Sequence, residues 1–282
     1  MTDDSYIASI EAWRRHMDER LREPYGWLAV AGLFWLRPGT NRVGSDPEAE
    51  VRLPAHTSSP SSGVIDVDGA RAVLHVTGAD QVQVEGSPVA DIELLPDVDP
   101  HPTYVNVGEV RLVLIRRGDR LGVRLWDPRR TERTSFSGRR WYPVDPAWRL
   151  AASFHAHTPP VSVHVPSVLG EVNVEHAIGR VSFLIAGETH TLEALPEETG
   201  ELFLIFADPT NRDVTYPSGR FLYTDPPEAG QVIVDFNRAY SPPCAYTAYA
   251  TCPLPPAENR LAVPIPAGEI YPRSSVPQGE AR

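Results

Sequence analysis

The chain lacks lysine altogether, so each of its 26 basic residues is an arginine. This absence excludes a Schiff-base lysine, and it excludes the lysine that P-loop enzymes and protein kinases place against nucleotide phosphates. The dinucleotide-binding, nucleophile-elbow and zincin motifs (G-x-G-x-x-G, G-x-S-x-G and H-E-x-x-H) are also absent. We therefore expect no organic cofactor, and no motif assigns a reaction or decides whether the protein is an enzyme.

Long apolar runs are scarce as well. The longest, residues 27–36, is too short to span a bilayer, and the N-terminal residues 1–4 are acidic where a secretory signal would be basic. The formal net charge of −11 argues against nucleic-acid and anionic-membrane partners. These observations predict a soluble, cytoplasmic protein.

One segment has a helical pattern and the rest has a β pattern. Residues 5–22 carry apolar side chains at three- and four-residue spacing, and Pro24 and Gly26 end that helix. From about residue 50 the period changes to two, and Gly, Pro or Asp bounds each apolar run. The expected strands are residues 63–67, 71–77, 81–85, 110–117, 120–126, 148–154, 161–165, 181–186, 201–206, 219–223 and 231–235.

Short strands without interleaved helices predict a mainly β fold, an antiparallel sandwich or barrel. The proline-rich tail after residue 241 should cross the surface as extended loop. For domains, we expect residues 1–40 to supply the helix and a buried apolar segment, and residues 41–282 to form the β-rich part. That part has two possible halves, 41–130 and 131–282.

The first candidate site is a cluster of arginines in an otherwise acidic chain. Strand alternation would place Arg120 and Arg124 on one face, and we take Arg124 as a candidate ligand for a carboxylate or phosphate. The alternative is a solvated surface whose arginines pair with acids elsewhere. The cluster comprises Arg116, Arg117, Arg120, Arg124, Arg129, Arg130, Arg133, Arg139 and Arg140.

The second candidate site follows the last expected strand. An acid, an amide and a guanidinium, Asp235, Asn237 and Arg238, come together where a loop can close over a ligand, and Arg220 and Tyr240 add donors. The alternative is a buried polar network that ties the tail to the sheet, because buried charges persist only when paired.

Cysteine and histidine give further candidates. Cys244 and Cys252 are eight positions apart, and they could be packed thiols, a disulfide or a nucleophile with its neighbour. His155, His157 and His164 could hold a metal, but no acidic residue has a diagnostic spacing, so we expect no metal site.

The chain resembles the bacterial and archaeal family known as domain of unknown function sixteen eighty-four, over nearly its full length. The resemblance implies no function or cofactor, but its motifs coincide with the two candidate sites. It rests on residues 26–36, Arg117–Arg124 with Asp127, Phe136 and Gly138, 141–149, 219–222, 235–245, 252–261 and 267–269.

These observations favour a pocket for a small anionic metabolite where the tail 236–269 closes over a sheet end. Arg220 and Arg238 would clamp the anion, and Asn237 and Tyr240 would orient it. Any chemistry would be cofactor-independent hydrolysis or acid/base catalysis at Asp235, Tyr240 or Cys244. The alternative is a non-catalytic interaction module whose Asp-x-Asn-Arg cluster is structural.

Overall fold

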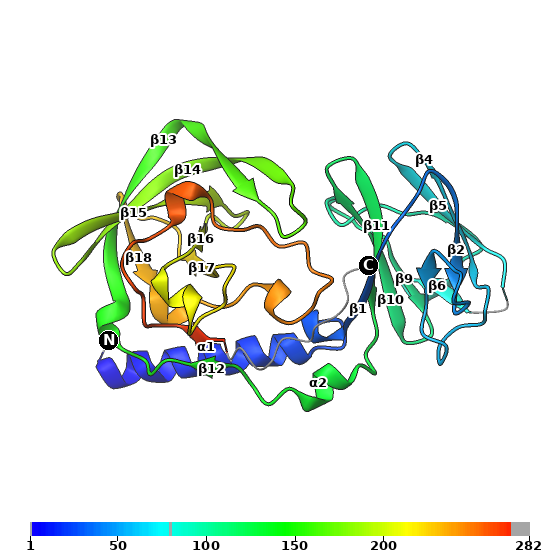
Figure 1. The fold of residues 1–282 in the computed structure, drawn as a ribbon, viewed down its shortest axis with the longest axis horizontal. Coiled ribbons are helices and arrows are strands. Elements are labelled where there is room, and N and C mark those ends of the chain that lie inside the picture. Colours follow the sequence, from blue (N-terminus) through cyan, green and yellow to red (C-terminus); the bar gives the residue numbers. More distant parts are fainter. Residues whose placement is uncertain (1, 79–80, 272–282) are drawn as a thin grey trace. The chain divides into compact units, whose positions relative to one another are not determined.

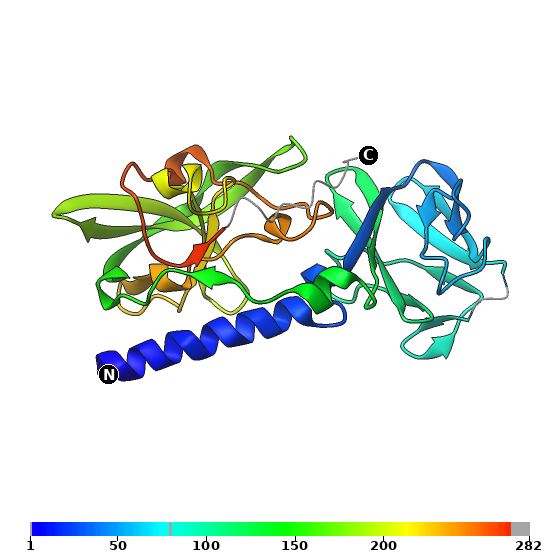
Figure 2. The ribbon, with the colours of Figure 1, turned by 60° about the horizontal axis from the view of Figure 1, so that its bottom comes forward.

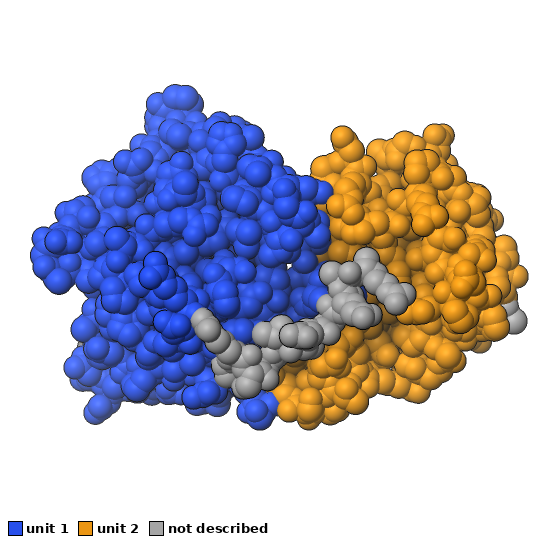
Figure 3. All heavy atoms as spheres, viewed as in Figure 1, with its two compact units in different colours: residues 1–19, 137–282 blue, residues 20–136 orange. Residues whose placement is uncertain are grey.

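The computed structural model describes residues 2–78 and 81–271, and the chain divides into two compact units (Figures 1 and 3). Unit 1 contains residues 1–19 and 137–282, and unit 2 contains residues 20–136. The predicted fold class is confirmed, because nearly all strand pairs are antiparallel and the long helix is N-terminal. Among the helices that the structure describes, none has the length and hydropathy of a membrane-spanning segment.

Unit 2 is a β-sandwich. Its two sheets have the orders β1-β11-β10-β9-β6-β7 and β3-β2-β4-β5-β8. The apolar segment that was expected only to be buried begins as a short 3-10 turn, η1, and continues as edge strand β1. The elements are η1 (Trp27–Ala29), β1 (Val30–Trp35), β2 (Gly39–Gly44), β3 (Val51–Arg52), β4 (Gly63–Asp68), β5 (Arg71–Val76), β6 (Val82–Val84), β7 (Ser87–Pro88), β8 (Asp91–Glu93), β9 (Tyr104–Val107), β10 (Val110–Arg117), β11 (Arg120–Trp126) and α2 (Thr131–Ser135).

Both sheets of unit 2 contribute to one core. Val43 and Ile65 point into it from one sheet, and Leu112 and Val123 point into it from the other. The expected hairpin over residues 110–126 is present, with Arg117 opposite Arg120 and Gly118 at φ +53° in the turn between them. Glycine suits this turn because a side chain disfavours positive φ.

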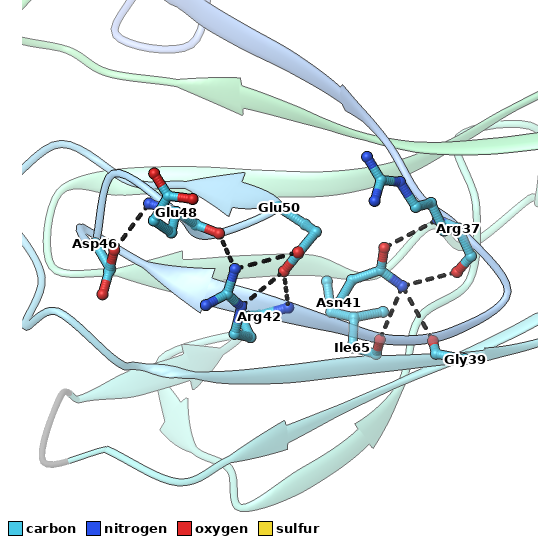
Figure 4. A network of polar contacts seen from close by, with 8 residues as sticks. All are labelled: Arg37, Gly39, Asn41, Arg42, Asp46, Glu48, Glu50 and Ile65. Carbon is cyan, nitrogen blue, oxygen red and sulfur yellow. Dashed lines mark hydrogen bonds and ion pairs between the residues drawn. The ribbon is translucent and has the colours of Figure 1, made fainter.

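A buried side-chain amide in β2 anchors the turn that precedes this strand (Figure 4). The side-chain amide of Asn41, fully buried, donates to the carbonyl oxygens of Arg37, Gly39 and Ile65, and its oxygen accepts from the Arg37 N–H. The next residue, Arg42, points outward and hydrogen-bonds to Glu50, which lowers the pKa of that carboxyl to about 2. An Asn-Arg pair thus places the amide inside and the guanidinium outside.

Unit 1 is built on one curved antiparallel sheet, with the order β17-β16-β15-β14-β13-β18. Its edge strands β17 and β18 also lie next to each other, so the sheet curls toward a barrel (Figure 1). The elements are α1 (Asp3–Arg22), β12 (Arg140–Trp141), η2 (Pro146–Trp148), β13 (Arg149–Pro166), β14 (Val172–Ile185), β15 (Glu188–Pro196), β16 (Leu202–Phe206), η3 (Pro209–Arg212), β17 (Arg220–Thr224), β18 (Gln231–Asp235), η4 (Phe236–Arg238), η5 (Pro243–Ala245), η6 (Ala257–Asn259) and β19 (Glu269–Ile270).

Strand β13 corrects one expectation. Residues 148–154 and 161–165 were expected to be separate strands, but they are parts of a single strand, Arg149–Pro166. Its pairing with β14 shifts register between Ala156 and Val161. Pro159 and Pro160 lie in that gap and lack the N–H that a ladder needs, so the pairing lapses there while the chain stays extended.

The tail after residue 241 corrects a second expectation. Its described part, residues 242–271, has little regular secondary structure, as its prolines predict, but several of its side chains are buried rather than lying on the surface. Ala245, Leu261, Ile265 and Ala267 are buried, and the last three belong to the core of unit 1. The tail therefore completes the core.

Helix α1 packs against this completed core through the face that carries Tyr6, Ile10 and Arg14 (Figure 2). Trp13, on the same helix, makes an edge contact with Trp141 of β12, at 5.6 Å between ring centroids.

Candidate functional site

Asp235 and Asn237 form one internal network with helix α1. The Tyr6 hydroxyl lies 2.8 Å from Asp235 Oδ1 and 2.9 Å from Oδ2 and donates to that carboxylate, which also accepts from the Asn237 backbone N–H at 3.1 Å. The Asn237 amide donates to the Asp145 carbonyl at 2.8 Å and accepts from the Asp145 N–H at 3.0 Å. All three side chains are buried, so the network joins α1 and the segment before β13 to the end of β18.

Burial, followed by the hydrogen bond to Asp235, raises the pKa of Tyr6 above its ordinary value of 10.0. Because the folded state holds this proton more tightly, the stabilisation is complete below pH 10 and decreases as the pH rises toward the folded-state pKa. We expect Tyr6→Phe to lower the free energy of unfolding by about 1 kcal/mol at pH 7. The difference from the wild type should shrink above pH 10. Urea titrations between pH 7 and 11 measure both, and a difference that stays constant over that range would contradict this account.

Arg220 lies in a second internal network. Its guanidinium, fully buried, donates to Asp208 Oδ2 at 2.6 Å, to the Ile265 carbonyl at 3.0 Å and to the Ala267 carbonyl. Asp208 is equally buried and also accepts from the Thr210 and Ile265 N–H groups. The pair therefore ties the start of β17 to the tail.

The remaining predicted site residues are dispersed. Arg238 is half-buried, and its Nε has no hydrogen-bond partner within residues 2–78 and 81–271. Tyr240 pairs through its backbone with Phe221 and stacks near Tyr223. Arg124 belongs to unit 2, is 6% exposed and lies over the Trp27 ring, 5.1 Å from its centroid.

Among the other eight clustered arginines, Arg117, Arg129, Arg130 and Arg139 form ion pairs with acidic residues. Arg117 pairs with Asp97 at 2.7 Å, and Arg129 pairs with Glu109 at 2.6 Å. Such pairs are what the solvated-surface alternative predicts, whereas the side chains of Arg124 and Arg139 are buried and do not fit it.

Cys244 and Cys252 lie side by side and are both reduced. The Cys244 N–H donates to Cys252 Sγ at 3.3 Å. The hydrogen bond from Cys252 lowers the pKa of the Cys244 thiol, while burial opposes that shift.

A third network of polar contacts joins three segments whose proximity the sequence analysis did not predict. Arg139, with a 3% exposed side chain, donates to Asp18 at 2.9 Å and lies 3.3 Å from the buried carboxylate of Glu269. Glu269 also accepts from the Ser241 N–H at 2.8 Å and from the Tyr246 hydroxyl. Burial raises the pKa of Glu269, and Arg139 opposes that shift.

A pocket of about 660 Å³ lies between the η3 turn and the tail, within unit 1. Arg212 and Arg260 line it, both exposed, and neither forms an ion pair with any described residue. Asp208 is also in the wall, but its charge is balanced by Arg220 at 2.6 Å. The pocket therefore has a net positive lining. The other lining residues are Ala207, Pro209, Asn211, Pro217, Leu261 and Ala262.

The sequence reasoning missed Arg212 and Arg260, although a local signal exists. Asn-Arg occurs at 211–212, 237–238 and 259–260, and each asparagine is buried at or next to the end of a 3-10 turn. In each pair the arginine is the more exposed residue, as it also is at residues 41–42. The repeated dipeptide thus marks short turns in which the asparagine is buried and the arginine beside it is the more exposed residue.

His157, one of the three histidines considered as metal ligands, lies beside an acidic side chain. His157 Nε2 lies 2.7 Å from Glu193, which also pairs with Arg180 at 2.6 Å. Across the described ranges, no group of three or more His, Cys, Asp or Glu side chains is placed to hold a metal ion.

Comparison with known proteins gives a family but no activity. The family model described as "Protein of unknown function (DUF1684)" matches residues 134–270, so the resemblance expected in residues 26–36 and 117–124 lies outside the matched range. No curated protein matches the chain.

Solved structures also match. The solution structure of an uncharacterized protein from Haloarcula marismortui is 32% identical, covers 50% of this chain and 80% of its own, and has a TM-score of 0.42. The FhaA FHA domain, solved in a complex with an intracellular domain, is 20% identical with a TM-score of 0.24, and covers 33% of this chain and 96% of its own.

Proposed function

The chain belongs to the family of proteins of unknown function DUF1684, and we propose that its unit 1 binds a small carboxylated or phosphorylated metabolite in the pocket lined by Arg212 and Arg260. The observation that carries the proposal is the pair of exposed guanidiniums that share this pocket without an acidic partner. A guanidinium donates two parallel hydrogen bonds to a carboxylate or phosphate, so two of them suit a single anionic group or a dianion.

The proposal keeps the expected ligand class and the expected participation of the tail, but assigns the clamp to different arginines. Arg220 already uses its donors on Asp208 and two carbonyl oxygens, so it supports the wall rather than the ligand. By neutralising Asp208, Arg220 keeps a carboxylate in the wall from repelling an anion. Arg238 and Arg124 remain predicted ligands without an assigned pocket.

A thermal-shift screen of the full chain against carboxylated and phosphorylated metabolites tests the proposal. A ligand at one hundred times its dissociation constant adds about 2.7 kcal/mol to the free energy of unfolding, which raises the melting temperature by several degrees. We expect the shift to be lost in Arg212→Ala combined with Arg260→Ala. No shift from a broad panel, or an equal shift in that double variant, would contradict the proposal.

The second candidate function is a non-catalytic interaction module. It is favoured by the observation that Asp235 and Asn237 form hydrogen bonds with Tyr6 and with each other, so these groups are already occupied within the protein. In this account hydrolysis at Asp235, Tyr240 or Cys244 does not occur. A panel that gives no thermal shift would support this candidate over the anion pocket.

A further inference from the structure

The two cysteines of the chain are held against each other in unit 1. Cys244 lies in the short turn η5, and its backbone N–H donates to Cys252 Sγ at 3.3 Å. The Cys252 sulfur therefore lies directly against the backbone of Cys244. A disulfide needs two cysteines whose α-carbons lie within about 7 Å, and contact between the backbone N–H of one cysteine and the sulfur of the other is compatible with that separation.

The backbone around each cysteine is fixed by separate contacts. The Tyr216 hydroxyl donates to the Cys244 carbonyl at 3.0 Å, and the Tyr271 hydroxyl lies 3.4 Å from the Ala245 carbonyl. On the other side, the Cys252 carbonyl accepts from the Val168 N–H at 3.0 Å. These contacts therefore hold the two cysteines next to each other in the folded protein.

The two thiols differ in the way that a nucleophile and a resolving group differ. Cys244 is half-buried and is the more accessible residue of the two, whereas Cys252 is 5% exposed. The hydrogen bond from Cys252 lowers the pKa of Cys244, which favours its thiolate, the form that reacts with peroxides.

We propose that Cys244 and Cys252 are a redox pair that closes reversibly into an intramolecular disulfide when a hydroperoxide oxidises Cys244. The Cys244 thiolate attacks one peroxide oxygen, the O–O bond breaks, and a sulfenic acid and hydroxide form. The Cys252 sulfur then attacks the Cys244 sulfur, so that the S–S bond forms and the S–O bond breaks. The departing hydroxide takes the Cys252 proton. Two thiols are oxidised, and hydrogen peroxide is reduced to two waters.

The test treats the reduced full chain with hydrogen peroxide, unfolds it in acid, alkylates free thiols and measures the intact mass. We expect both thiols to become protected together, with the loss of two hydrogen atoms, and a dithiol reductant to restore both. In Cys252→Ser, Cys244 should stop at the sulfenic acid, which dimedone traps. In Cys244→Ser, Cys252 should remain open to alkylation, with thiol loss slowed about tenfold or more.

Two results would overturn the redox pair. One is a wild-type chain whose two thiols are both still alkylated after peroxide treatment. The other is protection that arises from a covalent dimer, which non-reducing electrophoresis detects. Neither result depends on the anion pocket, since no ligand enters the assay.

Discussion

Arg220→Ala is expected to lower the free energy of unfolding by about 3–5 kcal/mol, although the residue is a predicted ligand. In the wild type the Arg220 guanidinium lies 2.6 Å from the Asp208 carboxylate, and both are fully buried. The substitution leaves that carboxylate buried without its cation. It also leaves the Ile265 and Ala267 carbonyl oxygens without their donor. Urea titration of the full chain measures the loss.

Arg212→Ala is the matched control for that substitution. It removes an arginine from the same pocket region, but Arg212 is exposed and pairs with no described acid, so the free energy of unfolding should change by less than about 0.5 kcal/mol. If Arg220→Ala were as stable as Arg212→Ala, the ion pair between Arg220 and Asp208 would not stabilise the pocket wall. The role of Arg220 as a ligand-binding residue would then remain open.

Arg139→Ala is expected to be similarly damaging, by about 3–5 kcal/mol at neutral pH. It leaves the buried carboxylate of Glu269 without a cation and removes the guanidinium that links Asp18 of α1 to Glu269 in the tail. Arg140→Ala, at the next position, is the control, because the Arg140 side chain is exposed.

The loss in Arg139→Ala should depend on pH in a defined direction. Burial already raises the pKa of Glu269, and removal of the cation raises it further. A carboxyl with a raised folded-state pKa favours the folded state below its unfolded-state pKa of about 4.3, and that contribution disappears as the pH rises. The difference between wild type and variant should therefore be smaller at pH 5 than at pH 7. An equal loss at both values would contradict the buried-carboxylate explanation.

The sequence predicted the elements whose signals are local. Residues 110–117 and 120–126 alternate around Gly118, and residues 5–22 repeat at helical spacing, so both patterns can be recognised without knowledge of any distant residue. The strand over residues 149–166 was divided because its prolines resemble a boundary. They interrupt the pairing but not the extended chain.

Partners that are far apart in the sequence could not be assigned in the same way. Arg139 pairs with Asp18, 121 positions away, and Tyr246 bonds to Glu269, 23 positions away. The general rule that buried charges need partners predicts that such pairs exist, but it does not predict which acid each arginine contacts. The burial of the tail escaped prediction because its apolar residues are separated by prolines and follow no period.

The central claim is that Arg212 and Arg260 bind an anion, and calorimetric titration tests it most directly. The ligand with the largest thermal shift would be titrated into the wild type, Arg212→Ala, Arg260→Ala and, as the control arginine outside the pocket, Arg140→Ala. A hydrogen bond to a charged group contributes about 1.5–3 kcal/mol, so each pocket variant should bind about tenfold or more weakly. Arg140→Ala should bind like the wild type. Unchanged affinity in both pocket variants would contradict the claim.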